Sequence, residues 1–346
     1  MIFSHGITTA ARLSIHPVAP QSGRREGTMK KPMNPAETPP IIDAHHHLWD
    51  LDAHDYPWLR PGTPSIVGDT GAIRRNYLAG DFLADSAGLN LIGTVHLDGG
   101  FDPRDPVGET RFADAAHRAH GFPNAIVGAV DLASPEAPAL IEAHQAASPL
   151  FRGVRQILAW HQNPRLSYGV RCDLMDDPAW RRGFALLGPA GLSFDLQVFP
   201  GQMRDAARLA RDFPDTQIVL NQAGMPDGLI DGDLRAWRAG MARLAELPNV
   251  SVKVSGLAML KPDWTLTELR HVMDVTVGAF GADRVMLGSN FPVDRLFRSY
   301  RTIFDGYLAV TRGYSVAERM AILSGTAVRI YRPAALSPLH ERNLTA

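Results

Sequence analysis

Residues 41–50, which read IIDAHHHLWD, bring histidines together in a pattern that suits chemistry. Two apolar residues lead into the segment, as in a short buried strand, and alternate side chains of a strand share one face. His45 and His47 should therefore project in the same direction. Two imidazoles aimed at one point suit a divalent metal ion or an anionic substrate. Taken alone, this short motif is equally compatible with a polar loop.

The rest of the chain alternates apolar, β-type runs with helical stretches. Candidate strands lie at 41–45, 91–96, 125–130, 153–158, 192–197, 217–221, 250–254 and 284–288. Such alternation indicates an α/β protein with a parallel sheet. Eight units over about 290 residues predict a single (β/α)8 TIM barrel rather than an open, doubly wound sheet. No GxGxxG motif follows the first strand, so a dinucleotide-binding fold gains no support.

Helices are expected at 202–212, 234–247, 266–280 and 316–323. Thr265 and Ser315 stand where helix-capping residues belong, and Glu318 follows Ser315 by three positions, as in a capping box. Asp233 offers a similar start signal for the second of these helices. The start signals therefore agree with the helical periodicity.

Composition narrows the class of protein. The chain has 346 residues, 45% of them hydrophobic, which is enough for a sizeable core. Its net charge of -1 argues against a nucleic-acid or membrane-surface binder driven by charge. The single cysteine, Cys172, excludes an internal disulfide framework and fits a reducing, cytoplasmic environment. A nucleophilic role for this thiol is the weaker interpretation, and no apolar run has the length of a membrane helix.

The ends of the chain differ from its middle. Residues 1–39 are rich in Pro, Ser, Thr, Arg and Gly without apolar periodicity, which predicts a disordered extension. Met29 or Met33 is an alternative start. We expect the barrel at 40–334 and a C-terminal tail at 335–346. Two long connections, 48–90 and 98–111, follow the first two strands and should wall a substrate cavity, because loops after barrel strands build the active-site face.

Polar residues recur where the predicted strands end. If one strand face points into the barrel, the inward polar set is Asp43, His45, His47, Thr94, His96, Arg155, Asp195, Gln197, Gln222, Lys253, Ser255 and Asn290. Asp98 and Asp131 are further candidates at the ends of the second and third strands, and Asp294 lies just beyond the last. Buried polar and charged groups cost several kcal/mol unless they are paired. A scaffold would not accumulate so many without use, so the set indicates an active or binding site.

Lys253 has two interpretations. It either neutralises a substrate carboxylate or oxyanion, or it forms an internal ion pair with Asp195 or Asp43. Only Lys30, Lys31 and Lys261 accompany it in the whole chain. Both interpretations remain open from the sequence.

Several motifs, in order, resemble one branch of the amidohydrolase superfamily of metal-dependent-hydrolase barrels, which contains sugar lactonases and 2-pyrone-4,6-dicarboxylate lactonase. The matching stretches are IDAHHHLWD (42–50), DYPWL (55–59), DPVGET (105–110), RGVRQIL (152–158), GLSFDLQVFPGQM (191–203), LNQAGMP (220–226), VSVKVSGL (250–257) and MLGSNFPVD (286–294). The resemblance covers about residues 41–331. It implies hydrolysis at an activated carbonyl, with the HxH pair at His45 and His47 and a carboxylate- or carbonyl-holding arginine at Arg155.

Two positions depart from the pattern of the branch. Gln222 stands where relatives commonly have His, and Asn290 stands where the superfamily has Asp. Neither amide can be a general base. Asp294 would supply the missing carboxylate if its loop curls over the barrel mouth; otherwise it belongs to a turn or helix cap after Pro292. Two histidines with amides make a thin ligand set for zinc, so a single zinc or manganese ion is compatible with the site but dispensable.

The resulting hypothesis is a cytoplasmic hydrolase that opens a small lactone or related cyclic ester from sugar-acid or aromatic-acid catabolism. His45 and His47 polarise the carbonyl through a metal ion or directly, and Asp294 activates water. The expected substrate-binding residues are Arg155, Gln197, Gln222, Asn290 and Lys253. Alternatives are a nonoxidative decarboxylase of an aromatic acid and a catalytically impaired barrel that binds a small acid. The expected partner is a small molecule, without nucleic acid or membrane, and a homodimer is compatible.

Overall fold

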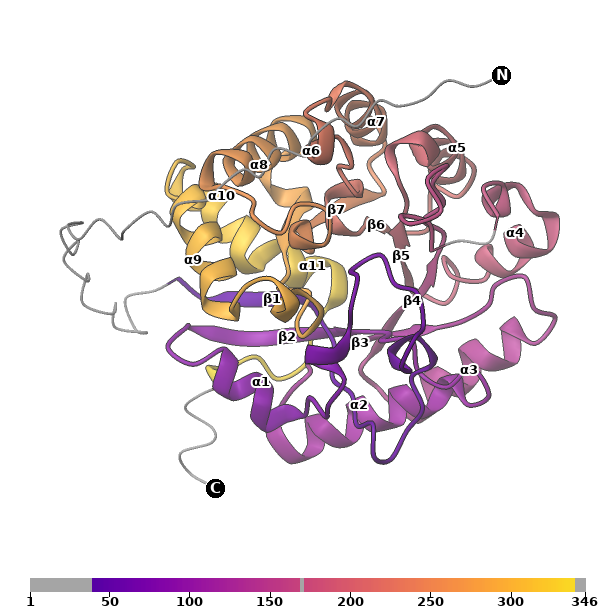
Figure 1. Ribbon diagram of the computed structural model, residues 1–346. Coiled ribbons are helices and arrows are strands. Elements are labelled where there is room, and N and C mark those ends of the chain that lie inside the picture. Colours follow the sequence, from indigo (N-terminus) through magenta and orange to yellow (C-terminus); the bar gives the residue numbers. More distant parts are fainter. Residues whose placement is uncertain (1–38, 169–170, 340–346) are drawn as a thin grey trace, which may run out of the picture. The chain divides into compact units, whose positions relative to one another are not determined.

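The computed structural model describes residues 39–168 and 171–339, and they form the predicted (β/α)8 barrel (Figure 1). Eight parallel strands follow one another in chain order around a single sheet. The strands are β1 (Ile41–His46), β2 (Leu91–Leu97), β3 (Ala125–Ala129), β4 (Phe151–Ile157), β5 (Ser193–Gln197), β6 (Ile218–Leu220), β7 (Val250–Val254) and β8 (Val285–Leu287). They closely match the predicted strands.

Helices surround the sheet (Figure 1). They are α1 (Ala79–Asp85), α2 (Pro106–His120), α3 (Ala137–Ala147), α4 (Pro178–Phe184), α5 (Met203–Asp212), α6 (Gly228–Asp231), α7 (Arg235–Ala245), α8 (Leu266–Phe280), α9 (Tyr300–Thr311), α10 (Val316–Met320) and α11 (Thr326–Tyr331). Thr265 and Ser315 cap α8 and α10 as predicted; Ser315 forms the predicted capping box with Glu318, and Thr265 forms another with Glu268. In the helix expected over 316–323, the α-helical part ends at Met320, and a π-helical segment follows over Ala321–Gly325.

The barrel closes where the chain just after β8 meets β1. The Asn290 amide N–H donates to the His45 carbonyl at 2.7 Å, and the His47 N–H donates to the Phe291 carbonyl, also at 2.7 Å. A Cβ atom at Gly288 would lie 2.4 Å from the His45 Cβ, closer than any real contact. Glycine at this position therefore permits the close approach that closes the barrel beside the histidines.

A β-bulge in β1 overturns one expectation about Asp43. The pairing of β1 with β2 shifts register between Asp43 and His46, which interrupts the simple alternation of faces. Asp43 consequently faces outward, where it accepts hydrogen bonds from the Ser289 hydroxyl (2.6 Å) and the Tyr300 hydroxyl (2.9 Å). The prediction that Asp43 shares a face with the two histidines was wrong, because a bulge cannot be read from alternation.

The inward face of β2 was also predicted one residue out of register. Val95 and Leu97 pack inside the barrel, whereas His96 faces α2 and Thr94 accepts or donates a hydrogen bond with the outward His46 ring at 2.9 Å. The apolar side chains of β2, and not its polar ones, point into the barrel. Thr94 and His96 are therefore not part of the inward polar ring.

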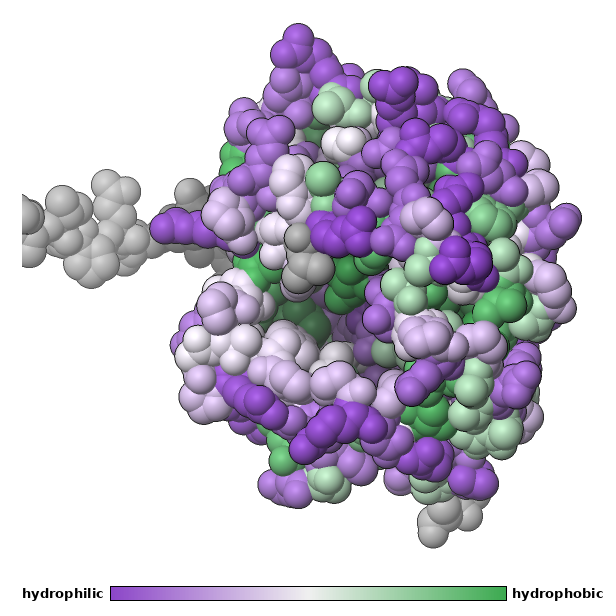
Figure 2. Space-filling view, turned by 90° about the vertical axis from the view of Figure 1, so that its right-hand side faces the viewer, coloured by the Kyte–Doolittle hydropathy of each residue, from purple (hydrophilic) through white to green (hydrophobic). Residues whose placement is uncertain are grey.

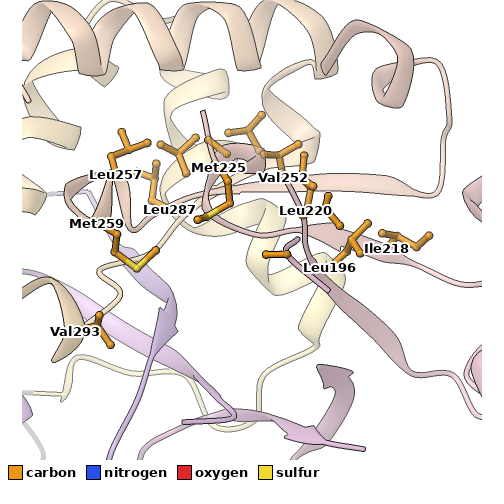
Figure 3. Packing of buried hydrophobic residues seen from close by; sticks show 14 of the residues in the cluster. Leu196, Ile218, Leu220, Met225, Val252, Leu257, Met259, Leu287 and Val293 are labelled. Carbon is orange, nitrogen blue, oxygen red and sulfur yellow. The ribbon is translucent and has the colours of Figure 1, made fainter. Parts of the chain in front are cut away.

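Two apolar layers hold the barrel together. A small interior cluster includes Val95, Val219 and Met286, and Tyr331 from α11 extends into it. Most of the larger cluster lies between the sheet and the helices, and it extends to Met259 and Val293 at the carboxyl end of the strands; Figure 3 shows part of it on the side of β5 to β8. The residues labelled there are Leu196, Ile218, Leu220, Met225, Val252, Leu257, Met259, Leu287 and Val293.

The predicted domain limits are only partly covered by the described residues. Nearly all of the extension expected at 1–39 lies outside them, so its disorder stays a prediction. At the other end, the chain beyond 334 still packs on the barrel: the Ser337 N–H donates to the Ile92 carbonyl at 3.0 Å, and Leu339 is buried. Of the helices described, none combines the length and apolar character that spanning a membrane requires.

Gly288→Ala should lower the free energy of unfolding by about 1–3 kcal/mol, because the added methyl group is forced against the β1 backbone. Gly278→Ala is the matched control, since it lies on α8 with open space around it and should be neutral or slightly stabilising. Chemical denaturation of both variants measures the difference. Equal stability of the two would contradict this account of barrel closure.

Candidate active site

A cavity of about 860 Å³ opens at the carboxyl end of the strands. Figure 2 shows this face hollowed, with green, apolar residues in the hollow and both pale and strongly hydrophilic residues around it. Trp58 and residues 63–66 line it from the loop after β1, and Gly99 and Gly100 line it from the loop after β2, which confirms both predicted walls. The loop after β4 adds a third wall through Pro164, Arg165, Ser167 and Tyr168. The length of the loop after β4 could have predicted this wall from the sequence, but that criterion was applied only to the first two loops.

Five of the eight predicted site residues line the cavity. They are His47, Arg155, Gln197, Gln222 and Asn290. They come from β4, β5 and the segments that follow β1, β6 and β8, so the fold gathers residues that are far apart in sequence. The other three, His45, Asp294 and Lys253, are buried nearby but are not among the lining residues.

His47 presents a proton acceptor to the cavity. Its Nδ1 atom lies 2.8 Å from the Leu97 carbonyl oxygen, which can only accept, so Nδ1 must carry the proton. Burial, with a smaller contribution from the nearby Arg155 guanidinium, lowers the pKa of His47 to about 3. The imidazole is thus neutral at ordinary pH, and its Nε2 lone pair is the free atom. A hydrogen-bond-donating role for this atom is not supported.

His45 lies deeper, against the His47 ring. The two ring centroids are 5.2 Å apart and the rings are nearly perpendicular. Neither ring nitrogen of His45 has a hydrogen-bond partner among the described residues. Burial, and next the positive charge of Lys253, lowers the pKa of His45 well below its usual value. An unsatisfied buried imidazole costs about 1–3 kcal/mol per group, so we expect a water molecule or ligand beside it.

Arg155 is held at the cavity floor by Asp98. Its Nε donates to the Asp98 carboxylate at 3.1 Å, and its Nη2 donates to the Asp98 backbone carbonyl. Both side chains are nearly buried, with 5% and 9% exposed. The guanidinium is therefore fixed in orientation, as recognition of a carboxylate or oxyanion requires.

Two amide side chains occupy strained backbone positions. Gln222 and Asn290 have φ values of 54° and 57°, in the left-handed region that non-glycine residues seldom adopt. The Gln222 amide donates to Asn290 Oδ1 at 3.4 Å, while Gln222 Oε1 has no partner among the described residues. Backbone strain of this kind tends to be kept at functional sites. The strain and the free oxygen both mark these amides as site residues.

Asp294 lies in a turn after Pro292, over Val293–Leu296, and faces Asn290 rather than the cavity. The Asn290 Nδ2 donates to its carboxylate at 2.7 Å. Burial raises the pKa of Asp294 to about 7. This placement supports a role in orienting the Asn290 amide and gives no support to direct activation of water by Asp294.

Lys253 forms one of the two ion pairs considered from the sequence. Its Nζ donates to Asp195 Oδ1 at 2.6 Å, both side chains are fully buried, and the Tyr331 hydroxyl donates to the same carboxylate. Burial lowers the pKa of Lys253 to about 8, and Asp195 limits that decrease. Because the Lys253 ammonium group is buried and paired with Asp195, the expected contact between Lys253 and the substrate gains no support.

Sequence reasoning gave no individual role to three residues beside the cavity, Trp58, Glu109 and Arg165, whereas Asp98 had been a candidate at the end of its strand. The Trp58 indole donates to the Gly99 carbonyl at 2.7 Å, and Glu109 accepts from the Gly99 N–H at the same distance. Glu109 belongs to the DPVGET motif, which had indicated only a resemblance. Cys172, by contrast, is exposed and is not among the residues that line the cavity, so a nucleophilic role for its thiol gains no support.

Comparison with known proteins places the chain in a family. The family described as amidohydrolase matches residues 42–332. This protein belongs to the amidohydrolase family. An uncharacterized protein of Sinorhizobium fredii, y4mH, is 44% identical over 84% of this chain and 98% of its own length. The L-fucono-1,5-lactonase of Burkholderia multivorans is 32% identical over 84% of this chain and 95% of its own.

A solved amidohydrolase structure from Burkholderia multivorans, with bound zinc, is 28% identical to this chain. It has a TM-score of 0.71 and covers 85% of this chain and 99% of its own. Family membership and lactonase-named relatives make this protein a hydrolase, and they confirm the superfamily predicted from the motifs.

The donor set of this chain does not fit a catalytic zinc ion. Such ions take three protein ligands from His, Cys and carboxylates. Within residues 39–168 and 171–339, no group of three or more His, Cys, Asp and Glu side chains is arranged to hold a metal ion. His45 and His47 are accompanied by amides, and the buried ammonium of Lys253 adds a positive charge near His45.

Purified protein should contain much less than one equivalent of zinc or manganese, and a chelator should leave its hydrolytic activity unchanged, because the donor set is short of ligands. Elemental analysis of the protein, with assays before and after EDTA treatment, provides the measurement. Stoichiometric metal together with loss of activity on chelation, restored by added zinc, would overturn this prediction.

Proposed function

We propose that this protein opens a small lactone, or a related cyclic ester, that carries a carboxylate group. The observation that carries the proposal is the pairing of a neutral imidazole acceptor, His47 Nε2, with a fixed guanidinium, Arg155, in one cavity. This pair provides a base for water and a cation for a developing negative charge. Lactonase-named relatives at 32% identity support the same reaction class.

The proposed reaction begins with a water molecule held between His47 and the lactone carbonyl. His47 Nε2 takes one proton while the water oxygen attacks the carbonyl carbon, and the carbonyl electrons move to its oxygen. Arg155 and the amide groups of Gln197, Gln222 and Asn290 stabilise this oxyanion by hydrogen bonding. When the intermediate collapses, the ring C–O bond breaks, the leaving oxygen takes the proton from His47, and a hydroxy acid results.

The low basicity of the unliganded His47 is compatible with this role. Next to burial, the positive charge of Arg155 is the largest cause of the depressed pKa of His47. An anionic substrate or oxyanion beside Arg155 offsets that charge and raises the basicity of the imidazole. His47 would thus become a stronger base as the reaction makes the oxyanion.

The charge of the cavity supports an anionic substrate. Of the described residues that line it, two are arginines, Arg155 and Arg165, and none is Asp or Glu. Apolar side chains make up much of the wall: Trp58, Ile66, Ile157, Met259 and Val293. A carboxylate on the substrate suits the two arginines, and these apolar side chains suit the carbon skeleton of its ring.

A hydrolysis screen tests this function. Sugar lactones, muconolactones and pyrone carboxylates are assayed with a pH indicator and, in parallel, for carbon dioxide. We expect acid release without carbon dioxide, with kcat/KM at least about tenfold higher for carboxylated than for neutral lactones, the difference of about 1.4 kcal/mol that one good ionic contact provides. Carbon dioxide release would favour a decarboxylase, and binding without turnover would favour an impaired barrel.

His47→Gln should reduce kcat/KM by about 100-fold or more, the usual contribution of a general base. His144→Gln is the matched control, because His144 is also buried and hydrogen-bonded, to Thr110 and Ala129, but does not line the cavity. The control should stay within about threefold of the unaltered protein. Equal activity of the two variants would remove His47 from the mechanism.

A further inference from the structure

One short turn at the end of β2 contacts three side chains of the cavity. The Leu97 carbonyl accepts from His47 Nδ1 at 2.8 Å, and the Gly99 carbonyl accepts from the Trp58 indole at 2.7 Å. Between them, Asp98 holds the Arg155 guanidinium through its carboxylate and its carbonyl. Residues 97–100 are called the β2 turn below. Its position determines where His47, Arg155 and Trp58 stand.

A buried carboxylate on a neighbouring helix fixes this turn. Glu109, in the first turn of α2, is 2% exposed, and its Oε1 accepts from the Gly99 N–H at 2.7 Å. His96 Nε2 lies 3.1 Å from the same oxygen and joins the clamp from the outer face of β2. The sheet holds the turn only as far as Asp98, whose N–H donates to the Val127 carbonyl.

The clamp lies directly behind His47. A Cβ atom built on Gly99 would be 3.1 Å from Glu109 Oε1, 3.7 Å from the Tyr56 ring and 3.8 Å from the His47 Cβ. The Gly99 backbone is thus enclosed between Glu109 and His47. A shift of Gly99 toward Glu109 or away from it would move the groups that hold His47 and Trp58.

We propose that Glu109 is a positioning residue that sets the geometry of His47, Arg155 and Trp58 by anchoring the β2 turn. The proposal deepens the proposed hydrolase function and rests on it only for its activity measurement. Glu109 does not line the cavity, so it acts through the turn and not on the substrate.

Helix packing alone does not explain a carboxylate at this position. Burial of an ionisable side chain costs several kcal/mol unless hydrogen bonds compensate, and an apolar side chain would pack α2 against β2 without that cost. Glu109 Oε2 has no hydrogen-bond partner among the described residues, so Oε1 makes all of its compensating bonds. The side chain is therefore retained for an acceptor atom placed at the Gly99 N–H.

Substitutions of Glu109 separate the effect of its side-chain length from the effect of its charge. Glu109→Gln keeps an oxygen acceptor at the same distance without the charge, whereas Glu109→Asp keeps the charge but shortens the side chain by one methylene. Glu109→Leu removes the acceptor altogether. The matched control is Asp114→Asn, because Asp114 is also buried on α2 but bonds to Ser148, away from the cavity.

We expect Glu109→Asp and Glu109→Leu to lower kcat/KM by about 100-fold, since a displacement near 1 Å in a catalytic group has an effect of this size. Glu109→Gln should retain most of the original kcat/KM, and its kcat/KM should be at least tenfold higher than that of Glu109→Asp. Asp114→Asn should change stability without this loss. Activity of folded Glu109→Asp equal to that of Glu109→Gln would overturn the proposal. If Glu109→Leu does not fold, the comparison of Glu109→Asp with Glu109→Gln still tests the proposal.

A second measurement does not need catalysis. In protein labelled with 15N at tryptophan, the Trp58 indole N–H reports its bond to the Gly99 carbonyl, and Trp58→Phe identifies its signal. This signal should shift in Glu109→Asp and Glu109→Leu and stay near its original position in Glu109→Gln and Asp114→Asn. No shift in any Glu109 variant would overturn the positioning role. Shifts in a protein that hydrolyses no lactone would leave the positioning role supported and refute only the proposed function.

Discussion

The hydrogen bond from His47 Nδ1 to the Leu97 carbonyl is the interaction on which the site depends. It joins β1 to the end of β2 and leaves Nε2 of a buried imidazole as the free atom. A bulge in β1 separates the outward Asp43 from the histidines, and the close approach at Gly288 brings the β8 side of the barrel against His45. The bulge in β1 and the close approach at Gly288 thus both shape the backbone around His45 and His47.

Buried polar groups around this point are satisfied in separate sets. Outside the barrel, Asp43 binds Ser289 and Tyr300, and burial raises the pKa of this carboxyl group to about 6. Inside it, Lys253 and Asp195 pair below the cavity. These groups hold the framework and leave the cavity to His47, Arg155 and the amides. Among the described residues, the ring nitrogens of His45 and the Oε1 atom of Gln222 lack a hydrogen-bond partner, as expected of groups that meet water or ligand.

Much of the fold could be predicted because local patterns agreed with one another. The helix over Leu266–Phe280 matches its prediction fully, since its capping box and its periodicity indicate the same limits. The inward residues of β4 and β5, Arg155 and Gln197, follow simple alternation and reach the cavity. Alternation failed where a bulge or an apolar preference intervened, at Asp43 and at His96.

Other features depend on tertiary contacts that no local pattern encodes. The direction of the Asp294 carboxyl group follows from its bond to Asn290, and Glu109 acquires its place only when α2 packs on β2. The wall formed by the loop after β4 is a different case, because the length criterion applied to the first two loops would also have indicated it.

The measurement that tests the central claim most directly is the 15N NMR spectrum of the histidine side chains across pH, with His47→Gln used to assign the His47 signals. The account predicts a neutral His47 at pH 7 that carries its proton on Nδ1, has an unprotonated Nε2, and stays neutral until the pH falls toward its depressed pKa of about 3. A proton on Nε2 at neutral pH, or an imidazolium with an ordinary pKa, would contradict the account, because neither form leaves an acceptor in the cavity.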